Sequence, residues 1–175
     1  MKMKTVTCVG GANIDIQGFS NAAINMRDSN PGTVRLCPGG VGRNIAENLA
    51  WLGANVRMVT AVGEDPFAEM ILRSCVNAGI DTSEIETIPG ARSSSYLVLT
   101  DSDGDMLAAI SDMHIMKQLN GDFILRHVAA LDNADAILAI TGETTFALPD
   151  GGKGNWQYAV TALDRCWNES DPVWK

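Results

Sequence analysis

The chain has 175 residues and a net charge of −8, and 46% of its residues are hydrophobic while 19% are charged. This length favours a single domain with a substantial core, and an acidic chain without a basic run argues against nucleic acid as a partner. The apolar runs are too short to cross a membrane and no secretory signal is recognisable, so we expect a cytoplasmic protein whose four scattered cysteines stay reduced.

The chain opens with a strand, a glycine turn and a second strand that has one polar face. Residues 4–9 predict the first strand, and a pair of glycines predicts the turn. In residues 13–17 (NIDIQ) polar and apolar residues alternate strictly, which puts Asn13 and Asp15 on the same face. Such a face belongs either to a solvated edge strand or to the wall of a ligand site, and the pattern alone leaves both open.

A dense glycine cluster follows, between a short strand at 33–37 and a helix at 42–52. Gly39 and Gly40 would let a ligand reach backbone N–H groups at the positive end of the helix, with Asn44 in the first turn. Such a site suits hydroxyl groups or a small anion, although a tight turn with an Asn cap would explain the pattern equally well. The residues expected on the apolar face of the helix are Val41, Ile45, Leu49 and Leu52.

The remaining elements continue the alternation of strands and helices. A buried strand at 56–62 precedes a helix that is capped by Asp65 and begins at Pro66. The next elements are expected at 93–100 and 106–111 (a hairpin), 120–131 (a helix) and 134–141 (a buried strand). The alternation predicts an α/β sheet covered by helices, and the hairpins predict a small second sheet that stands off it.

Several common nucleotide and metal motifs are absent from the sequence. It has no G-x-x-x-x-G-K-[ST] segment, and the third glycine of a dinucleotide fingerprint is replaced by Ile45, which makes a nicotinamide-cofactor protein a weak alternative. The DSDGD segment that starts at Asp101 departs from calcium-loop spacing, so we expect a solvated turn there and assign no metal site.

Four segments taken together resemble the amino-terminal half of the PfkB (ribokinase-like) carbohydrate kinases: GGANIDI, PGGVGRNIAENLAWLG, VTAVGEDPFAEMI and ARSSSYLVLTDSDGDMLAAI. The resemblance runs from about Val6 to about Ile140 and is greatest to the pseudouridine kinases within that family. It implies a Rossmann-like sheet with helices on both faces and a small β-sheet lid, with lid strands at about 13–18, 33–37 and 93–111. It also implies phosphoryl transfer from ATP, with Mg²⁺, to a hydroxyl of a sugar or nucleoside, pseudouridine being the best single candidate.

The resemblance further implies which residues bind the substrate. Those expected around the sugar are Asn13, Asp15, Gly39, Gly40 and Asn44. Those expected from the lid, near the base or over the sugar, are Ser94, Tyr96, Ile110 and Asp112. In this family the lid often mediates dimerisation, so a homodimer through the lid is expected as well.

The sequence departs from the family beyond residue 141. The second family signature, D-T-x-G-A-G-D, would carry the anion hole and the aspartate that accepts the hydroxyl proton, and it does not occur here. We therefore assign no catalytic residue and expect no kinase activity and doubtful ATP binding from this chain alone. Residues 142–175 are interpreted as an atypical tail from a truncation or a frameshift, with a weak helix at most over 158–166. The alternative function is a non-catalytic sugar-binding or dimerisation module.

Overall fold

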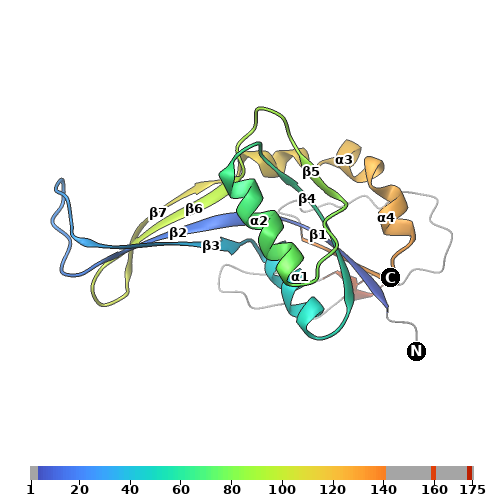
Figure 1. The fold of residues 1–175 in the computed structure, drawn as a ribbon, viewed down its shortest axis with the longest axis horizontal. Coiled ribbons are helices and arrows are strands. Elements are labelled where there is room, and N and C mark those ends of the chain that lie inside the picture. Colours follow the sequence, from blue (N-terminus) through green and yellow to red (C-terminus); the bar gives the residue numbers. More distant parts are fainter. Residues whose placement is uncertain (1–3, 141–158, 161–172, 175) are drawn as a thin grey trace.

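The computed structural model describes residues 4–140, 159–160 and 173–174. Figure 1 shows an α/β body from which a long β-sheet, the lid, projects to one side. The body sheet has the strand order β5-β4-β1-β8, and all its pairings are parallel. Its strands are β1 (Thr5–Val9), β4 (Asn55–Val62), β5 (Ile85–Thr87) and β8 (Ala136–Ala139).

Helices cover both faces of the body sheet. Neighbouring residues of a strand point to opposite faces and therefore belong to different cores. Cys8 and Met58 belong to a core packed against the first two helices, whereas Val9 and Val59 belong to a second core on the other face. The helices of the first face are α1 (Val41–Trp51) and α2 (Pro66–Asn77). Those of the second are the 3₁₀ helix η1 (His114–Gln118), α3 (Gly121–Arg126) and α4 (Val128–Asp132). This arrangement confirms the predicted fold class.

The lid is a four-stranded sheet of order β3-β2-β6-β7. Its strands are β2 (Asn13–Ser20), β3 (Gly32–Gly39), β6 (Ser94–Thr100) and β7 (Met106–Asp112). Only the β2–β6 pairing is parallel. In this register Asp15 lies opposite Cys37 and Tyr96, so the three side chains share one face, whereas Ile14 and Ile16 point to the other face and pack beneath α2.

Glycines allow the base of the lid to cross the start of α1 at close range. A Cβ built on Gly42 would lie 2.8 Å from the Cα of Gly10, and one on Gly40 would lie 2.6 Å from the Cα of Ala12. Gly40 also has a φ of 96°, which disfavours any side chain. The glycine turn after β1 and the glycine cluster before α1, which lie far apart in the sequence, therefore meet in a single junction.

The structure corrects the helix predicted at 120–131. That segment forms two helices, α3 and α4, because the chain leaves helical geometry at His127, where φ is −101° and ψ is 11°. The His127 ring contacts Glu84 and Glu86 through its two nitrogens and packs against Phe123 at a centroid distance of 4.5 Å. These tertiary contacts to the segment around β5 outweigh the local preference for one continuous helix.

Three further differences concern short elements and the face of α1. Leu52 is 84% exposed, and α1 instead buries Gly42 and Ala46, because the glycine junction brings that side closest to the body. Neither β5 nor η1 was predicted. A strand, β9 (Ala159–Val160), lies where a weak helix was expected and pairs antiparallel with β10 (Val173–Trp174). Among the described residues, no helix is long and apolar enough to span a membrane.

Candidate functional site

Asp15 and Gly39 meet at the base of the lid. The Nδ2 group of Asn13 donates a hydrogen bond to Asp15 Oδ1 at 2.6 Å. A Cβ on Gly39 would lie 2.9 Å from the Asp15 Cγ, so the carboxylate rests directly on the Gly39 backbone. The structure thus brings together three residues that the sequence places in one site.

The burial of this group suits recognition of a polar ligand. Asn13 is buried, and Asp15 remains half-exposed beside it. An ionised carboxylate only accepts hydrogen bonds, and its bonds to hydroxyl groups are charge-assisted and therefore strong. Because Asn13 fixes one carboxylate oxygen, the free lone pairs of Asp15 have a defined direction. Such an acceptor is suited to the hydroxyl groups of a polyol.

The glycine turn continues the site into α1. Gly40 is the N-cap residue of that helix and has no side-chain capping bond, and its carbonyl accepts the Asn44 N–H at 2.8 Å. Asn44 is exposed, and its Oδ1 accepts a hydrogen bond from Arg43 Nη1 at 3.0 Å. Asn44 therefore lies one turn from the point where Asp15 contacts Gly39.

Two lid residues, Ser94 and Tyr96, share the face of Asp15. Ser94 pairs with Asn13 and is 1% exposed, and its Oγ has no hydrogen-bond partner among the described residues. Tyr96 pairs with Asp15, but its hydroxyl lies 3.6 Å from the Met106 Sδ, toward the tip of the lid. Ser94 is thus beside the carboxylate, whereas the Tyr96 hydroxyl is directed away from it.

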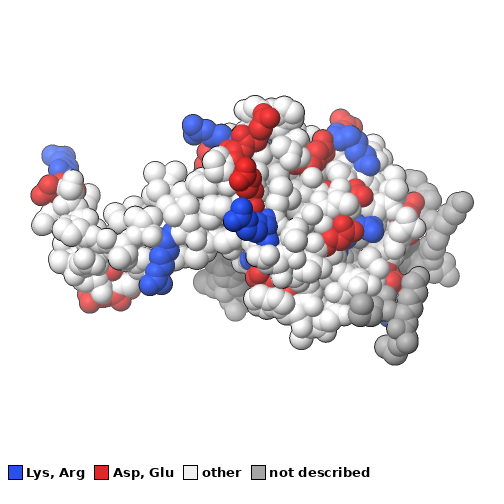
Figure 2. Space-filling model, viewed as in Figure 1, with Lys and Arg blue, Asp and Glu red and all other residues white. Residues whose placement is uncertain are grey.

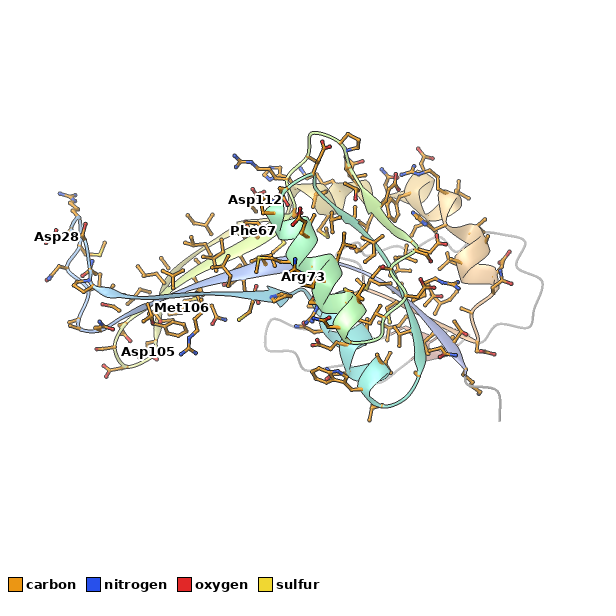
Figure 3. The ribbon with its side chains drawn as sticks, in the orientation of Figure 1. Asp28, Phe67, Arg73, Asp105, Met106 and Asp112 are labelled. Carbon is orange, nitrogen blue, oxygen red and sulfur yellow. The ribbon has the colours of Figure 1, made fainter. Side chains whose placement is uncertain are left out.

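Ile110 and Asp112 do not join this group. They pair with Leu97 and Ser95, whose side chains point to the opposite face of the lid from Asp15. Hydrogen bonds from His114 lower the pKa of the Asp112 carboxyl, so Asp112 has a local partner of its own. Figure 3 shows Asp112 at the body end of β7 and Met106 toward the tip.

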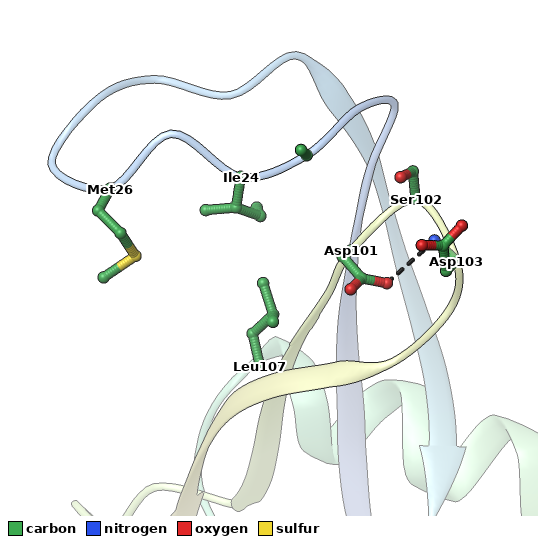
Figure 4. A pocket seen from close by; sticks show the side chains of 7 residues that line it. Ile24, Met26, Asp101, Ser102, Asp103 and Leu107 are labelled. Atoms are coloured by element: carbon green, nitrogen blue, oxygen red, sulfur yellow. Dashed lines mark hydrogen bonds between the residues drawn. The ribbon is translucent and has the colours of Figure 1, made fainter.

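A cavity of about 340 Å³ lies at the far tip of the lid rather than at this site. It opens between the loop after β2 and the β6–β7 hairpin (Figure 4), and Ile24, Met26 and Leu107 supply its apolar side. The Asp101 carboxylate accepts hydrogen bonds from the backbone N–H groups of Asp103 and Asp105 and so shapes the hairpin. This agrees with the solvated turn expected there. No cluster of three or more metal-ligating side chains occurs among the described residues.

Comparison with known proteins assigns the chain to a family. The model of the "pfkB family carbohydrate kinase" matches residues 3–168, nearly the whole chain. The chain belongs to the pfkB family of carbohydrate kinases. The match continues past Ile140, where the resemblance of the motifs ends.

Individual pfkB relatives align with about three quarters of the chain. The pseudouridine kinase of Escherichia coli is 40% identical over 134 residues, which cover 77% of this chain and 43% of that enzyme. The guanosine-inosine kinase of Exiguobacterium acetylicum is 30% identical, over 77% of this chain and 45% of its own. A solved carbohydrate kinase from Agrobacterium tumefaciens is 31% identical with a TM-score of 0.73, over 78% of this chain and 45% of its own. The chain thus spans less than half the length of these pfkB relatives.

Sequence reasoning missed one member of the pfkB glycine turn, Arg43. Arg43 is 5% exposed, and its side chain forms two hydrogen-bonded ion-pair contacts with Glu47, at 2.5 Å and 2.9 Å. It also donates to the Pro38 carbonyl at 3.4 Å. The signal was present in the sequence, since an arginine and a glutamate four residues apart on a helix face each other. An i,i+4 pair is normally a solvated surface feature, and the sequence alone does not indicate that this one is buried.

Proposed function

We propose that residues 4–140 form the sugar-binding half of a pfkB nucleoside kinase, with pseudouridine as substrate. The observation that carries this proposal is the Asp15 carboxylate, which Asn13 orients against the backbone of Gly39 at the base of the lid. The similarity to pseudouridine kinase and to guanosine-inosine kinase supports a nucleoside over a free sugar.

In this proposal the residues of the site form different hydrogen bonds with the substrate. Asp15 accepts hydrogen bonds from two ribose hydroxyl groups, while the N–H groups of the Gly39–Gly40 turn and the Asn44 amide donate to ribose oxygens. Ser94, whose buried Oγ is free among the described residues, adds a further hydroxyl close to Asn13. Ile110 and Asp112 lie on the other lid face and are not included.

The reaction of the family would transfer the γ-phosphoryl group of ATP, with Mg²⁺, to a ribose hydroxyl in the cytoplasm. ATP and Mg²⁺ would supply the phosphoryl group and the charge that stabilises its transfer. The Asp15 carboxylate and the glycine turn would bind and orient the sugar. The segment D-T-x-G-A-G-D does not occur in these 175 residues, so we expect binding of the nucleoside without turnover.

Calorimetric titration of the 175-residue chain with pseudouridine, uridine and ribose tests the proposal. We expect saturable pseudouridine binding that Asp15→Asn weakens at least about tenfold, since bonds to a charged acceptor contribute about 1.5–3 kcal/mol. Asp28→Asn, which changes an exposed carboxylate in the loop after β2, is the matched control and should have no effect. Equal binding by Asp15→Asn would contradict the proposed site.

A coupled assay of ADP release separates the two functional alternatives. Binding without ADP release favours the sugar-binding module, whereas turnover with pseudouridine, ATP and Mg²⁺ would show that the chain needs no second signature. Absence of binding to every nucleoside and sugar would overturn the proposal as a whole.

We also propose that two copies associate through the apolar face of the lid. Two rows of paired residues cross all four strands on the face opposite Asp15. They are Leu36, Ile16, Leu97 and Ile110, and Val34, Gly18, Leu99 and Ala108. Val34 is 68% exposed and Ile110 is 67% exposed. Figure 2 shows few charged side chains on the visible surface of the lid between its tip and the body.

A continuous apolar face of this kind on a soluble chain is typical of a protein interface. Light scattering after size exclusion should give the mass of a dimer for the native chain and of a monomer for Ile110→Asp. Leu125→Asp replaces a similarly exposed residue of α3 and serves as the control. A monomeric native chain would contradict the proposal.

A further inference from the structure

Arg43 violates two local rules of helix stability. It lies in the first turn of α1, where the positive end of the helix dipole disfavours a cation, and it precedes its partner Glu47, which is the weaker order for such a pair. It is also buried, which costs solvation free energy. Residues that break local rules in this way often serve a site rather than the fold.

The contacts of Arg43 indicate that it acts on the side chain of Asn44. Glu47 fixes the plane of the guanidinium through both of its terminal nitrogens. From that fixed plane Nη1 donates to the Asn44 Oδ1 at 3.0 Å. An arginine side chain has only donors, so the amide oxygen of Asn44, and not its nitrogen, must face it. The orientation of the Asn44 amide therefore follows from chemistry rather than from the assignment of its atoms.

We infer that the Arg43–Glu47 pair is a positioning device that turns the Nδ2 group of Asn44 outward as a hydrogen-bond donor for the substrate. This inference deepens the proposed function and rests on it. The site then combines a hydrogen-bond acceptor, the Asp15 carboxylate, with a hydrogen-bond donor, the Nδ2 group of Asn44. A ribose offers hydroxyl groups that donate to the first and accept from the second. Without Arg43 the Asn44 amide can flip and lose this selectivity.

Arg57 offers a matched control within the same chain. It is paired with the Asp81 carboxylate at 3.1 Å and donates to the Ala130 carbonyl at 3.2 Å, much as Arg43 contacts Glu47 and Pro38. It lies in the first half of β4, and Asn44 is not among its contacts. Arg57→Met therefore removes a comparable set of structural bonds and leaves the Asn44 amide as it is.

A double-mutant cycle in pseudouridine affinity tests the coupling. We expect Arg43→Met and Asn44→Ala each to weaken binding about tenfold, and the double variant to be no weaker than about tenfold to twentyfold. Arg43→Lys, which restores a donor to the Asn44 oxygen, should recover part of the affinity, and Arg57→Met should lower the melting temperature without changing affinity. Two effects that multiply to about a hundredfold, or full affinity in Arg43→Met, would overturn the inference.

A second measurement needs no ligand. In a ¹H–¹⁵N spectrum the side-chain amide signal of Asn44, identified by its loss in Asn44→Ala, should shift in Arg43→Met and stay in place in Arg57→Met. An Asn44 side-chain signal at the same position in Arg43→Met as in the native chain would overturn the inference. If the native chain binds neither pseudouridine, inosine nor ribose, the proposed function fails, and this spectrum still decides whether Arg43 orients Asn44.

Discussion

Asp65 ties the lid to the body by accepting two hydrogen bonds from Ser93, one from its N–H at 2.7 Å and one from its hydroxyl at 2.8 Å. The same carboxylate caps α2 through the N–H of Ala68 at 2.9 Å. Gly63 makes this crossing possible, because a Cβ there would lie 2.5 Å from the Ala91 carbonyl oxygen. One side chain thus joins the start of a body helix to the entry of β6.

We expect Asp65→Asn to lower the free energy of unfolding by about 1–3 kcal/mol, the usual cost of leaving a hydrogen-bond donor without its acceptor, here the Ser93 N–H. The asparagine oxygen can still accept from the Ala68 N–H and the Ser93 hydroxyl, which both bond Oδ1, but an NH₂ group then replaces Oδ2 and cannot accept from the Ser93 N–H. Urea unfolding at neutral pH measures the loss. Asp122→Asn changes an exposed carboxylate in the first turn of α3 and should leave stability within about 0.5 kcal/mol.

The stabilising effect of Asp65 should depend on pH. Burial alone would raise its pKa, but the hydrogen bonds from Ser93 and Ala68 outweigh burial and hold the pKa below its usual value of 3.8. A lowered folded pKa stabilises the protein above the unfolded pKa, and this contribution is lost as pH falls through the folded pKa. The difference in melting temperature between the native chain and Asp65→Asn should therefore be constant above about pH 5 and shrink below pH 4. A difference that grows in acid would contradict this assignment.

Gly39→Ala should separate ligand binding from stability. The new Cβ would lie 2.9 Å from the Asp15 Cγ and 3.1 Å from its Oδ1, so the carboxylate must move away from the turn. Because the carboxylate is the end of a side chain, we expect a small change in stability but at least about a tenfold loss of pseudouridine affinity. Gly121→Ala, where a Cβ meets nothing within 4 Å, is the control. Unchanged affinity in Gly39→Ala would place the sugar elsewhere.

Gly40→Ala should instead act on the fold. Its φ of 96° is unfavourable for alanine, and the new Cβ would lie 2.6 Å from both the Ala12 Cα and the Gly11 oxygen, which are backbone atoms. We expect a loss of about 3 kcal/mol or more in the free energy of unfolding. Gly104→Ala has a similar φ of 90° but open space, so its cost of about 1–2 kcal/mol isolates the strain in the backbone from the collision. Equal costs would mean that the junction can relax.

The sequence was sufficient for those parts of the fold that local periodicity determines. The alternation Asn13-Ile14-Asp15 predicted a strand with a polar face, and Asp65-Pro66 predicted the start of α2, because both signals act over a few residues. The split at His127 could not be predicted, since it depends on Glu84 and Glu86, some forty residues away in the chain. Long-range contacts of this kind leave no local pattern.

The candidate site was predictable to a different extent. The sequence suggested Asp15 and Gly39 as one site, but their contact depends on the antiparallel register of β2 and β3. The same register separates Ile110 and Asp112 from Asp15, because a shift of one residue exchanges the faces of a sheet. Composition and the order of motifs do not indicate which face of the lid a residue of a neighbouring strand will occupy. A site that spans several strands is therefore predicted less well than the strands themselves.

Cysteine labelling offers a probe of the Asp15 face that needs no change to the site itself. Burial raises the pKa of the Cys8 thiol to about 11, and burial likewise raises that of Cys75, so both stay protonated and shielded at pH 8. Cys37 is exposed and lies opposite Asp15 in the register of β2 and β3. In a Cys166→Ser background we expect a disulfide reagent to modify Cys37 alone, and the other two thiols only after unfolding.

Pseudouridine should slow this labelling if it occupies the Asp15 face. At a concentration of ten times its Kd, a ligand that fully shields Cys37 would reduce the rate about tenfold, because only the free protein reacts. At the same pseudouridine concentration, Asp15→Asn should leave protection of about twofold or less, because its binding is at least about tenfold weaker, and should not change the rate in the absence of ligand. Rapid modification of a second thiol would contradict the burial of Cys8 and Cys75, and an unchanged Cys37 rate under saturating pseudouridine would move the nucleoside to the other face of the lid.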